Sequence, residues 1–377
     1  MANTCLDKTV YEAALERVNF VFDNCDDIIV SMSGGKDSTV IYHLAHKVAA
    51  ERGRLPLKVF WLDQEAEWQA TEDYMRSIMY RDDVVPCWFQ IPFRLTNSLS
   101  FKDNFLYCWD KSKEDVWIRQ QDAIGIKENP LPERDRFKSL ISLLPSTCDC
   151  SGKEHVGVLV GMRAEENTVR RMAMMHAKSQ YKGITWCRKT EKNTRVFWPI
   201  YDFSANDVWT CIAKNGLPYN RIYDAFYKFG IPKNAMRVSA LIHETAWHSI
   251  ERLQEAEPRM YNRYLARING VNCFNHFRNE IMPYVLPPYF DSWLEYRDYL
   301  LVNLIEPKYH AIFKQRWSRP GQNTDNWYKT HVREIMVNDI DGTTNDNYRS
   351  KSRLDDYRLP GGKYDKRSIE RMKNERP

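Results

Sequence analysis

The 377-residue sequence has no apolar run long enough to cross a membrane, and its first eight residues lack the basic and apolar regions of a signal peptide. Glycine (15) and proline (17) occur at ordinary frequencies, which excludes collagen-like and low-complexity chains. The nine cysteines are an odd and scattered set, unlike a disulfide framework. These absences predict a cytoplasmic protein with reduced thiols.

The excess of positive charge lies at one end of the chain. Lys and Arg number 55 against 50 Asp and Glu, which gives a net charge of +5. Residues 349–377 hold ten of the basic and five of the acidic side chains, so the rest of the chain is neutral. This basic tail could contact the phosphates of DNA or RNA. A solvated arm is the favoured alternative, because acidic residues are interleaved and the rest of the chain lacks the basic surface that nucleic-acid-binding proteins usually have.

Apolar periodicity predicts strands that alternate with helices in the first part of the chain. Residues 27–32, 57–62 and 155–160 are short apolar runs suited to buried strands, and a helical pattern follows each of them. Alternation of this kind is typical of an open, mostly parallel sheet with helices on both faces. We therefore expect an α/β domain over residues 1–240.

The remaining segments predict three further features. Residues 92–150 are irregular and are expected to form an insertion or a lid, in which Trp109 and Trp117 either stack on a base or, more often, pack as core. Helical patterns fill residues 241–321 and predict an α-helical domain. Residues 322–377 are polar and are expected to form a flexible basic tail.

A glycine-containing turn joins the first strand to the first helix. Residues 33–38 have the sequence SGGKDS and follow the strand at its carboxyl end, where parallel sheets bind their ligands. Two glycines let backbone N–H groups converge, and the helix adds its positive N-terminal end. Lys36 adds a full charge, although the spacing is not that of the Walker loop. A structural turn is the alternative, but this position favours phosphate binding.

The turn resembles the signature of the PP-loop superfamily, the adenine-nucleotide α-hydrolase-like enzymes. Within it the sequence is similar to the phosphoadenosine phosphosulfate (PAPS) reductase family. The supporting segments are Asp63 with Thr71, GMRAEEN at 161–167 with Arg170, PIYDFS at 199–204 with DVW at 207–209, and PYN at 218–220 with Tyr223-Asp224. Asn167 and Phe203 replace a serine and a tryptophan of the family patterns.

The resemblance implies a set of site residues. The expected nucleotide and phosphate ligands are Ser31, Ser33, Gly34, Gly35, Lys36, Asp37, Ser38, Asp63, Gly161, Arg163, Glu166 and Arg170. Lys36, Asp37, Asp63 and Arg163 are the expected catalytic residues. Asp37 and Asp63 end neighbouring strands and could hold Mg²⁺ together with phosphates. Arg163 and Arg170 could clamp a second anionic group.

The sequence departs from the sulfonucleotide reductases at the nucleophile. The E-C-G-x-H motif of those enzymes is absent, and neither Cys211 nor Cys273 lies in a comparable context. The C-terminal half, with IEPKYH at 305–310, instead resembles the immunoglobulin-binding-regulator-A-like branch, whose reaction is not settled. That branch implies a ParB/sulfiredoxin-like protein as a partner.

Two other motifs are weaker candidates. Cys148 and Cys150 could form a redox pair or part of a metal site, but a single C-x-C is more often two loop thiols. His243 and His248 are one position too far apart for the zinc-binding H-E-x-x-H pattern, so we do not expect zinc there.

We expect an enzyme that binds ATP or a related adenine nucleotide and cleaves it at the α-phosphate. The reaction would be pyrophosphate release, adenylyl transfer or a sulfur-linked modification, because groups that position and neutralise phosphates are present. One alternative is a PAPS reductase that uses a non-standard cysteine. Another is a non-catalytic nucleotide sensor that acts with DNA or a protein partner.

Overall fold

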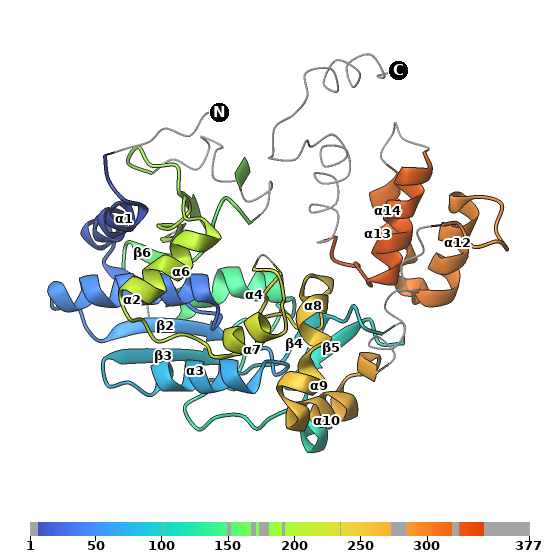
Figure 1. The fold of residues 1–377 in the computed structure, drawn as a ribbon, viewed down its shortest axis with the longest axis horizontal. Coiled ribbons are helices and arrows are strands. Elements are labelled where there is room, and N and C mark those ends of the chain that lie inside the picture. Colours follow the sequence, from blue (N-terminus) through green and yellow to red (C-terminus); the bar gives the residue numbers. More distant parts are fainter. Residues whose placement is uncertain are drawn as a thin grey trace, which may run out of the picture. The chain divides into compact units, whose positions relative to one another are not determined.

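The computed structural model describes residues 7–100, 102–148, 152–166, 171–172, 181–190, 193–233, 235–272, 285–318 and 324–342. The chain divides into two compact units, one of residues 1–166 and 170–281 and one of residues 167–169 and 282–377 (Figure 1). No helix in the described ranges is both long and apolar enough to span a bilayer.

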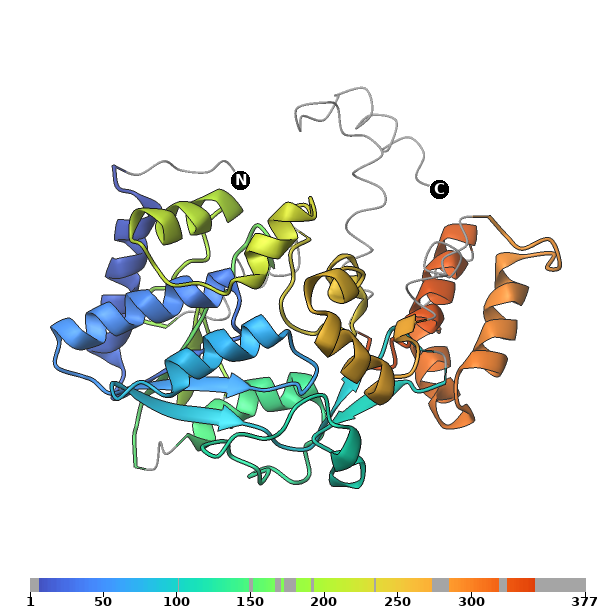
Figure 2. The same ribbon diagram turned by 60° about the horizontal axis from the view of Figure 1, so that its bottom comes forward.

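The first unit is built on a six-stranded sheet with the order β3-β2-β1-β6-β8-β7. Its strands are β1 (Asp27–Ser31), β2 (Leu57–Leu62), β3 (Val84–Phe89), β6 (Val156–Val160), β7 (Cys187–Lys189) and β8 (Thr194–Phe197). All neighbouring pairs are parallel except β7 with β8, which is antiparallel. Figures 1 and 2 show β2 and β3 side by side. The structure thus confirms the expected mostly parallel sheet.

Both faces of the sheet are buried. Ile29 of β1 lies in one core cluster, whereas its neighbours Ile28 and Val30 lie in the other. Such strands read as continuous apolar runs because neither face meets water. The helices that contribute to these cores include α1 (Val10–Asn24), α2 (Lys36–Glu51), α3 (Gln69–Met79), α6 (Ala205–Lys214) and α7 (Ile222–Lys228).

The insertion at 92–150 is packed into the first of these cores. It contains a hairpin of β4 (Phe93–Thr96) and β5 (Phe105–Cys108), followed by η1 (Lys111–Val116), α4 (Phe137–Leu143) and η2 (Leu144–Thr147). Trp109 is fully buried and packs edge-on against Trp117, with 5.5 Å between ring centroids. The two tryptophans therefore serve as core, in agreement with the commoner of the two expected roles.

The first unit extends past residue 240. η4 (Glu244–Ala246), α8 (Trp247–Ile250), α9 (Leu253–Ala256) and α10 (Pro258–Arg267) follow there. Leu241, Ile250 and Tyr264 are buried in the same core as strand residues such as Phe60. The expected helical domain of 241–321 therefore does not form one body, because its first part completes the core of the α/β unit.

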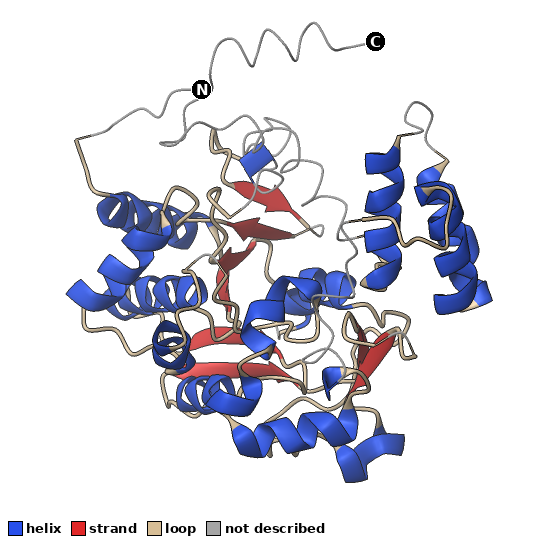
Figure 3. Ribbon diagram, turned by 45° about the vertical axis from the view of Figure 1, so that its right-hand side comes forward, coloured by secondary structure: helices blue, strands red, loops and turns tan. Residues whose placement is uncertain are grey.

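The second unit contains α12 (Trp293–Leu304), α13 (Pro307–Trp317) and α14 (Asp325–Met336), and its described part is helical (Figure 3). Ser292 and Thr324 cap α12 and α14 with their side chains. Helix α14 lies within the segment expected to be a flexible tail from residue 322. Residues 343–377, which include the basic tail, lie outside the described ranges.

Candidate functional site

The SGGKDS turn connects β1 to α2 as the sequence predicts. Gly34 adopts a φ of +68°, which glycine reaches without steric cost. Gly35 is the N-cap of α2 and supplies no side-chain hydrogen bond. The Ser38 hydroxyl donates to the Gly35 carbonyl at 2.9 Å and accepts the Ser33 N–H at 3.3 Å. The turn thus places the start of α2, with a glycine as its N-cap residue, next to the end of β1.

This turn lies at the point where the strand order reverses. After β1 the chain adds β2 and β3 on one side of that strand, and it then adds β6 on the other side. The carboxyl ends of two such strands are where open α/β sheets bind ligands. Gly161, one residue beyond β6, therefore faces the turn across this point.

Two glycines allow the close approaches that shape the turn. A Cβ on Gly34 would lie 2.6 Å from Cγ2 of Thr71 on α3. A Cβ on Gly161 would lie 2.7 Å from the backbone carbonyl oxygen of Asp37. Both distances are shorter than a Cβ contact tolerates, so a larger residue at Gly161 would displace the start of α2 and one at Gly34 would displace the turn or Thr71.

The segment 218–224 holds the turn from the other side. The Asn220 amide donates to the Gly34 carbonyl at 3.1 Å and to the Thr71 hydroxyl at 2.8 Å. The Tyr223 hydroxyl accepts the backbone N–H of Lys36 at 3.0 Å. The resemblance marked these residues, but their contacts with the turn are visible only in the structure.

Asp37 holds two cations at the turn. Its carboxylate accepts from Nζ of Lys36 at 2.8 Å and forms an ion pair with Nε of Arg163. Nη1 of Arg163 also contacts Glu165 at 2.8 Å, and Nη2 lies 4.0 Å from Glu166. The structure therefore gathers the predicted Lys36, Asp37, Arg163 and Glu166 from α2 and the loop after β6. Arg170 lies outside the described residues.

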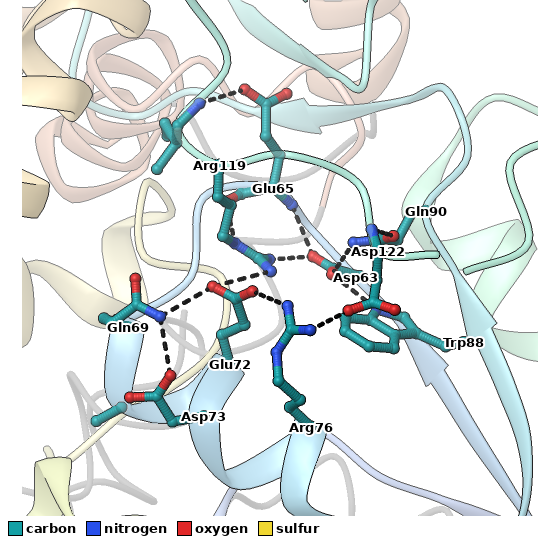
Figure 4. Close-up of polar contacts among 12 residues, drawn as sticks. Asp63, Glu65, Gln69, Glu72, Asp73, Arg76, Trp88, Gln90, Arg119 and Asp122 are labelled. Carbon is teal, nitrogen blue, oxygen red and sulfur yellow. Dashed lines mark hydrogen bonds and ion pairs between the residues drawn. The ribbon is translucent and has the colours of Figure 1, made fainter. Parts of the chain in front are cut away.

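Asp63 is fully buried and its oxygens are already engaged (Figure 4). One oxygen pairs with Arg119 and accepts the Glu65 N–H at 3.1 Å. The other accepts from Trp88 at 2.8 Å and from Gln90 at 3.0 Å. This donor-filled carboxylate does not fit the predicted Mg²⁺ site shared with Asp37. Within the described ranges, no three His, Cys, Asp or Glu side chains gather as a metal site.

Further acidic side chains after β2 belong to the same buried network, and the sequence analysis did not single them out. Glu65, with a φ of +58°, accepts from the Trp109 N–H at 2.8 Å and from Nε of Arg267 at 2.7 Å. Glu72 forms ion pairs with both Arg119 and Arg76, and Arg76 forms a further ion pair with Asp122 (Figure 4). The run DQEAEW at 63–68, with three acidic residues after a buried strand, was the available signal.

All six cysteines within the described ranges are buried, namely Cys25, Cys87, Cys108, Cys148, Cys187 and Cys211. Burial raises the pKa of the Cys25 thiol to about 12 and also raises the pKa of Cys108, Cys187 and Cys211. Such thiols stay protonated near neutral pH and are weak nucleophiles. Cys5, Cys150 and Cys273 lie outside the described residues.

The chain is similar to two curated proteins. It is 27% identical over 321 residues to the uncharacterized protein YbdN of Escherichia coli K12, which covers 80% of this chain and 77% of that protein. It is 24% identical over 259 residues to the uncharacterized protein MJ0973 of Methanocaldococcus jannaschii. That match covers 68% of this chain and half of the relative's length.

The chain is also similar to two solved structures and to one family model. A PAPS reductase from Candida auris, in complex with phosphate, aligns with a TM-score of 0.32 and 11% identity, over 60% of this chain and 94% of that one. The FMN adenylyltransferase of Candida glabrata aligns with a TM-score of 0.33 and 14% identity, over 59% of this chain and 64% of that one. Residues 27–85 and 111–229 match the model of the phosphoadenosine phosphosulfate reductase domain. These two stretches of the chain thus form a domain of the PAPS reductase-like family of the PP-loop superfamily.

Proposed function

We propose that the chain binds an adenine nucleotide with its phosphates at residues 33–38 and cleaves it at the α-phosphate. The observation that carries this proposal is the start of α2, whose N-cap residue is a glycine and which lies beside two buried cations, Lys36 and Arg163. Backbone N–H groups at a helix start and the helix dipole favour an anion there. Family membership supports a nucleotide as the source of that anion.

Asp37 gives the two cations their positions before a ligand arrives. Lys36 and Arg163 are 7% and 5% exposed, so each charge needs a counterion in the ligand-free protein. Asp37 is that counterion, through contacts to Nζ of Lys36 and Nε of Arg163. A phosphate that enters the turn would share these donors with Asp37. Charge-assisted bonds of this kind are the strong ones, and Arg163 can make them with two nitrogens.

The proposed reaction is a displacement at the α-phosphorus. An acceptor oxygen forms a bond to the α-phosphorus, and the bond from phosphorus to the oxygen bridging the α- and β-phosphates breaks. Pyrophosphate leaves with the bonding electron pair, and the acceptor proton passes to solvent. With water as the acceptor the products are AMP and pyrophosphate, and with another hydroxyl they are an adenylylated acceptor and pyrophosphate. The turn would stabilise the charge on the leaving pyrophosphate.

Reduction of PAPS is a second candidate, which the family model favours. It requires a thiolate that attacks the sulfur of the substrate. The described cysteines are buried, and the pKa values of four of them are raised, so they do not support this role. The proposal therefore ranks cleavage at the α-phosphate above reduction.

The test incubates the purified protein with ATP and Mg²⁺, and separately with PAPS and reduced thioredoxin. AMP, pyrophosphate and sulfite are quantified for the wild type, for Lys36→Ala and for Lys47→Ala. Lys47 is an exposed lysine on the same helix and is the matched control. AMP with pyrophosphate, lost only in Lys36→Ala, supports the proposal. Sulfite from PAPS would establish the second candidate instead.

The acceptor is identified by extending the same assay. If ATP binds without turnover, candidate hydroxyl and thiol acceptors are added, and formation of an adenylylated product is followed by mass spectrometry. Failure to bind ATP by equilibrium dialysis would overturn the proposal.

A further inference from the structure

Arg237 lies against the turn on a segment that is fixed in place. The side chain of Val238 reaches to 3.4 Å from where a Cβ of Gly35 would lie. Met236 and Val238 are buried in the same core as Tyr223. The Arg237 backbone N–H donates to the buried Ser249 hydroxyl at 3.3 Å. The backbone at Arg237 is therefore held beside the turn by packing and by a hydrogen bond.

The side chain of Arg237 differs from the two predicted cations in having no close counterion. Burial lowers the pKa of Arg237, and the guanidinium is close enough to Asp37 for the carboxylate charge to act on it. Among the described residues, however, no carboxylate forms a salt bridge with it. Lys36 and Arg163, by contrast, both pair with Asp37.

The local charge balance shows what this difference means. Lys36 and Arg163 are paired with carboxylates, namely Asp37, Glu165 and, at 4.0 Å from Nη2 of Arg163, Glu166. These five groups carry two positive and three negative charges, so without a further cation they would repel a polyanion. Arg237 brings the sum to zero, and it does so without a direct ion pair among the described residues. Its guanidinium donors are therefore available to an anionic ligand, and a partly buried cation without a direct counterion costs free energy that such a ligand would recover.

We propose that Arg237 is an anion subsite for the pyrophosphate portion of the nucleotide, beyond the α-phosphate. This inference rests on the proposed function and adds a specificity to it. The site would select nucleoside triphosphates over monophosphates, because only the former carry charge to reach Arg237. A guanidinium can donate two parallel hydrogen bonds to phosphate oxygens, which lysine cannot reproduce. Arg237 is thus a binding and specificity residue that the sequence motifs do not include.

The test measures binding of ATP, AMP and inorganic pyrophosphate by titration calorimetry. Arg237→Gln is compared with Arg237→Lys and with Arg259→Gln, which removes an exposed arginine of the same unit. We expect Arg237→Gln to lower the affinity for ATP and for pyrophosphate by about 10- to 100-fold, the range for hydrogen bonds to charged groups. The affinity for AMP should change little. The affinity of Arg237→Lys for ATP should lie between those of the wild type and Arg237→Gln, and that of Arg259→Gln should equal the wild-type value.

A second measurement separates binding from a structural role. Because Arg237 has no close counterion, Arg237→Gln should leave the midpoint of thermal unfolding unchanged or raise it. A lowered midpoint of Arg237→Gln, or an equal loss of affinity for AMP and for ATP, would overturn the inference. So would unchanged ATP affinity in Arg237→Gln when Lys36→Ala weakens it, and the proposed function would then still stand. A wild type that binds neither ATP nor pyrophosphate would instead overturn the proposed function.

Discussion

The Tyr223 hydroxyl accepts the backbone N–H of Lys36 at 3.0 Å, across 187 positions of the sequence. Three residues earlier, Asn220 donates to the carbonyl of Gly34 at 3.1 Å. One short segment therefore clamps both the strand side and the helix side of the turn. The segment therefore shapes the turn, because the Asn220 amide and the Tyr223 hydroxyl are both hydrogen-bonded to backbone groups of the turn.

Replacement of Tyr223 by phenylalanine should destabilise the first unit. The variant keeps the aromatic packing but leaves the Lys36 N–H without its acceptor in a buried place. A donor left unpaired in this way costs about 1–3 kcal/mol of unfolding free energy, which urea denaturation measures. Tyr227→Phe is the control, because Tyr227 lies on the same helix and is 77% exposed. Equal stability of the two variants would contradict the clamp.

Replacement of Gly161 by alanine should disturb the start of α2. The new Cβ would lie 2.7 Å from the Asp37 carbonyl oxygen and 2.8 Å from the Ser38 nitrogen, both of which are backbone atoms. Overpacking of this kind costs about 1–3 kcal/mol. Because the shift occurs at the turn, ATP affinity measured by calorimetry should fall together with stability.

Gly53→Ala supplies the comparison for Gly161→Ala. Gly53 has a φ of +63° and no heavy atom within 4 Å of its Cβ position. Alanine there should cost about 1–2 kcal/mol through backbone strain alone. ATP affinity should then remain at the wild-type value. If Gly161→Ala also left ATP affinity unchanged, the turn would not be the nucleotide site.

Much of the first unit follows from local patterns in the sequence. The strands at 27–31, 57–62 and 156–160 were predictable because burial on both faces demands continuous apolar runs. The turn was predictable because the glycines, Lys36 and Asp37 are adjacent. Arg163 could be placed near them only through the family resemblance, since 126 positions separate it from Asp37.

The features that could not be predicted from the sequence depend on contacts between distant segments. Periodicity in 241–272 shows that helices form, but it does not show that they pack on the sheet of the first unit. The helix α14 is polar in sequence, yet His331 is buried and stacks on Trp317 with ring centroids 4.6 Å apart. The unpaired cation at Arg237 has no local signal, because it is defined by the charges that surround it.

Replacement of Asp63 by asparagine tests the two roles assigned to this residue. Asp63 pairs with Arg119, and both side chains are almost completely buried. Removal of one partner of a buried pair leaves an uncompensated charge and should cost about 3–5 kcal/mol of unfolding free energy. Asp73→Asn, on the exposed side of α3, is the control and should be nearly neutral. A normal unfolding free energy for Asp63→Asn, with loss of Mg²⁺-dependent activity, would favour the metal role predicted from the sequence.

The acid stability of the first unit should depend on His43 of α2. Burial lowers the pKa of His43 to about 4, against a value near 6.5 in the unfolded chain. Between these values the unfolded chain binds a proton that the folded chain does not, so stability falls as the pH decreases from 6.5 to 4. At about 1.4 kcal/mol per pKa unit the loss reaches about 3 kcal/mol. Urea denaturation at pH 7.5, 6 and 5 should therefore show a slope that is weaker in His43→Gln. His248→Gln removes an exposed histidine and should keep the wild-type slope, whereas an unchanged slope in His43→Gln would mean that this ring is protonated in the folded protein.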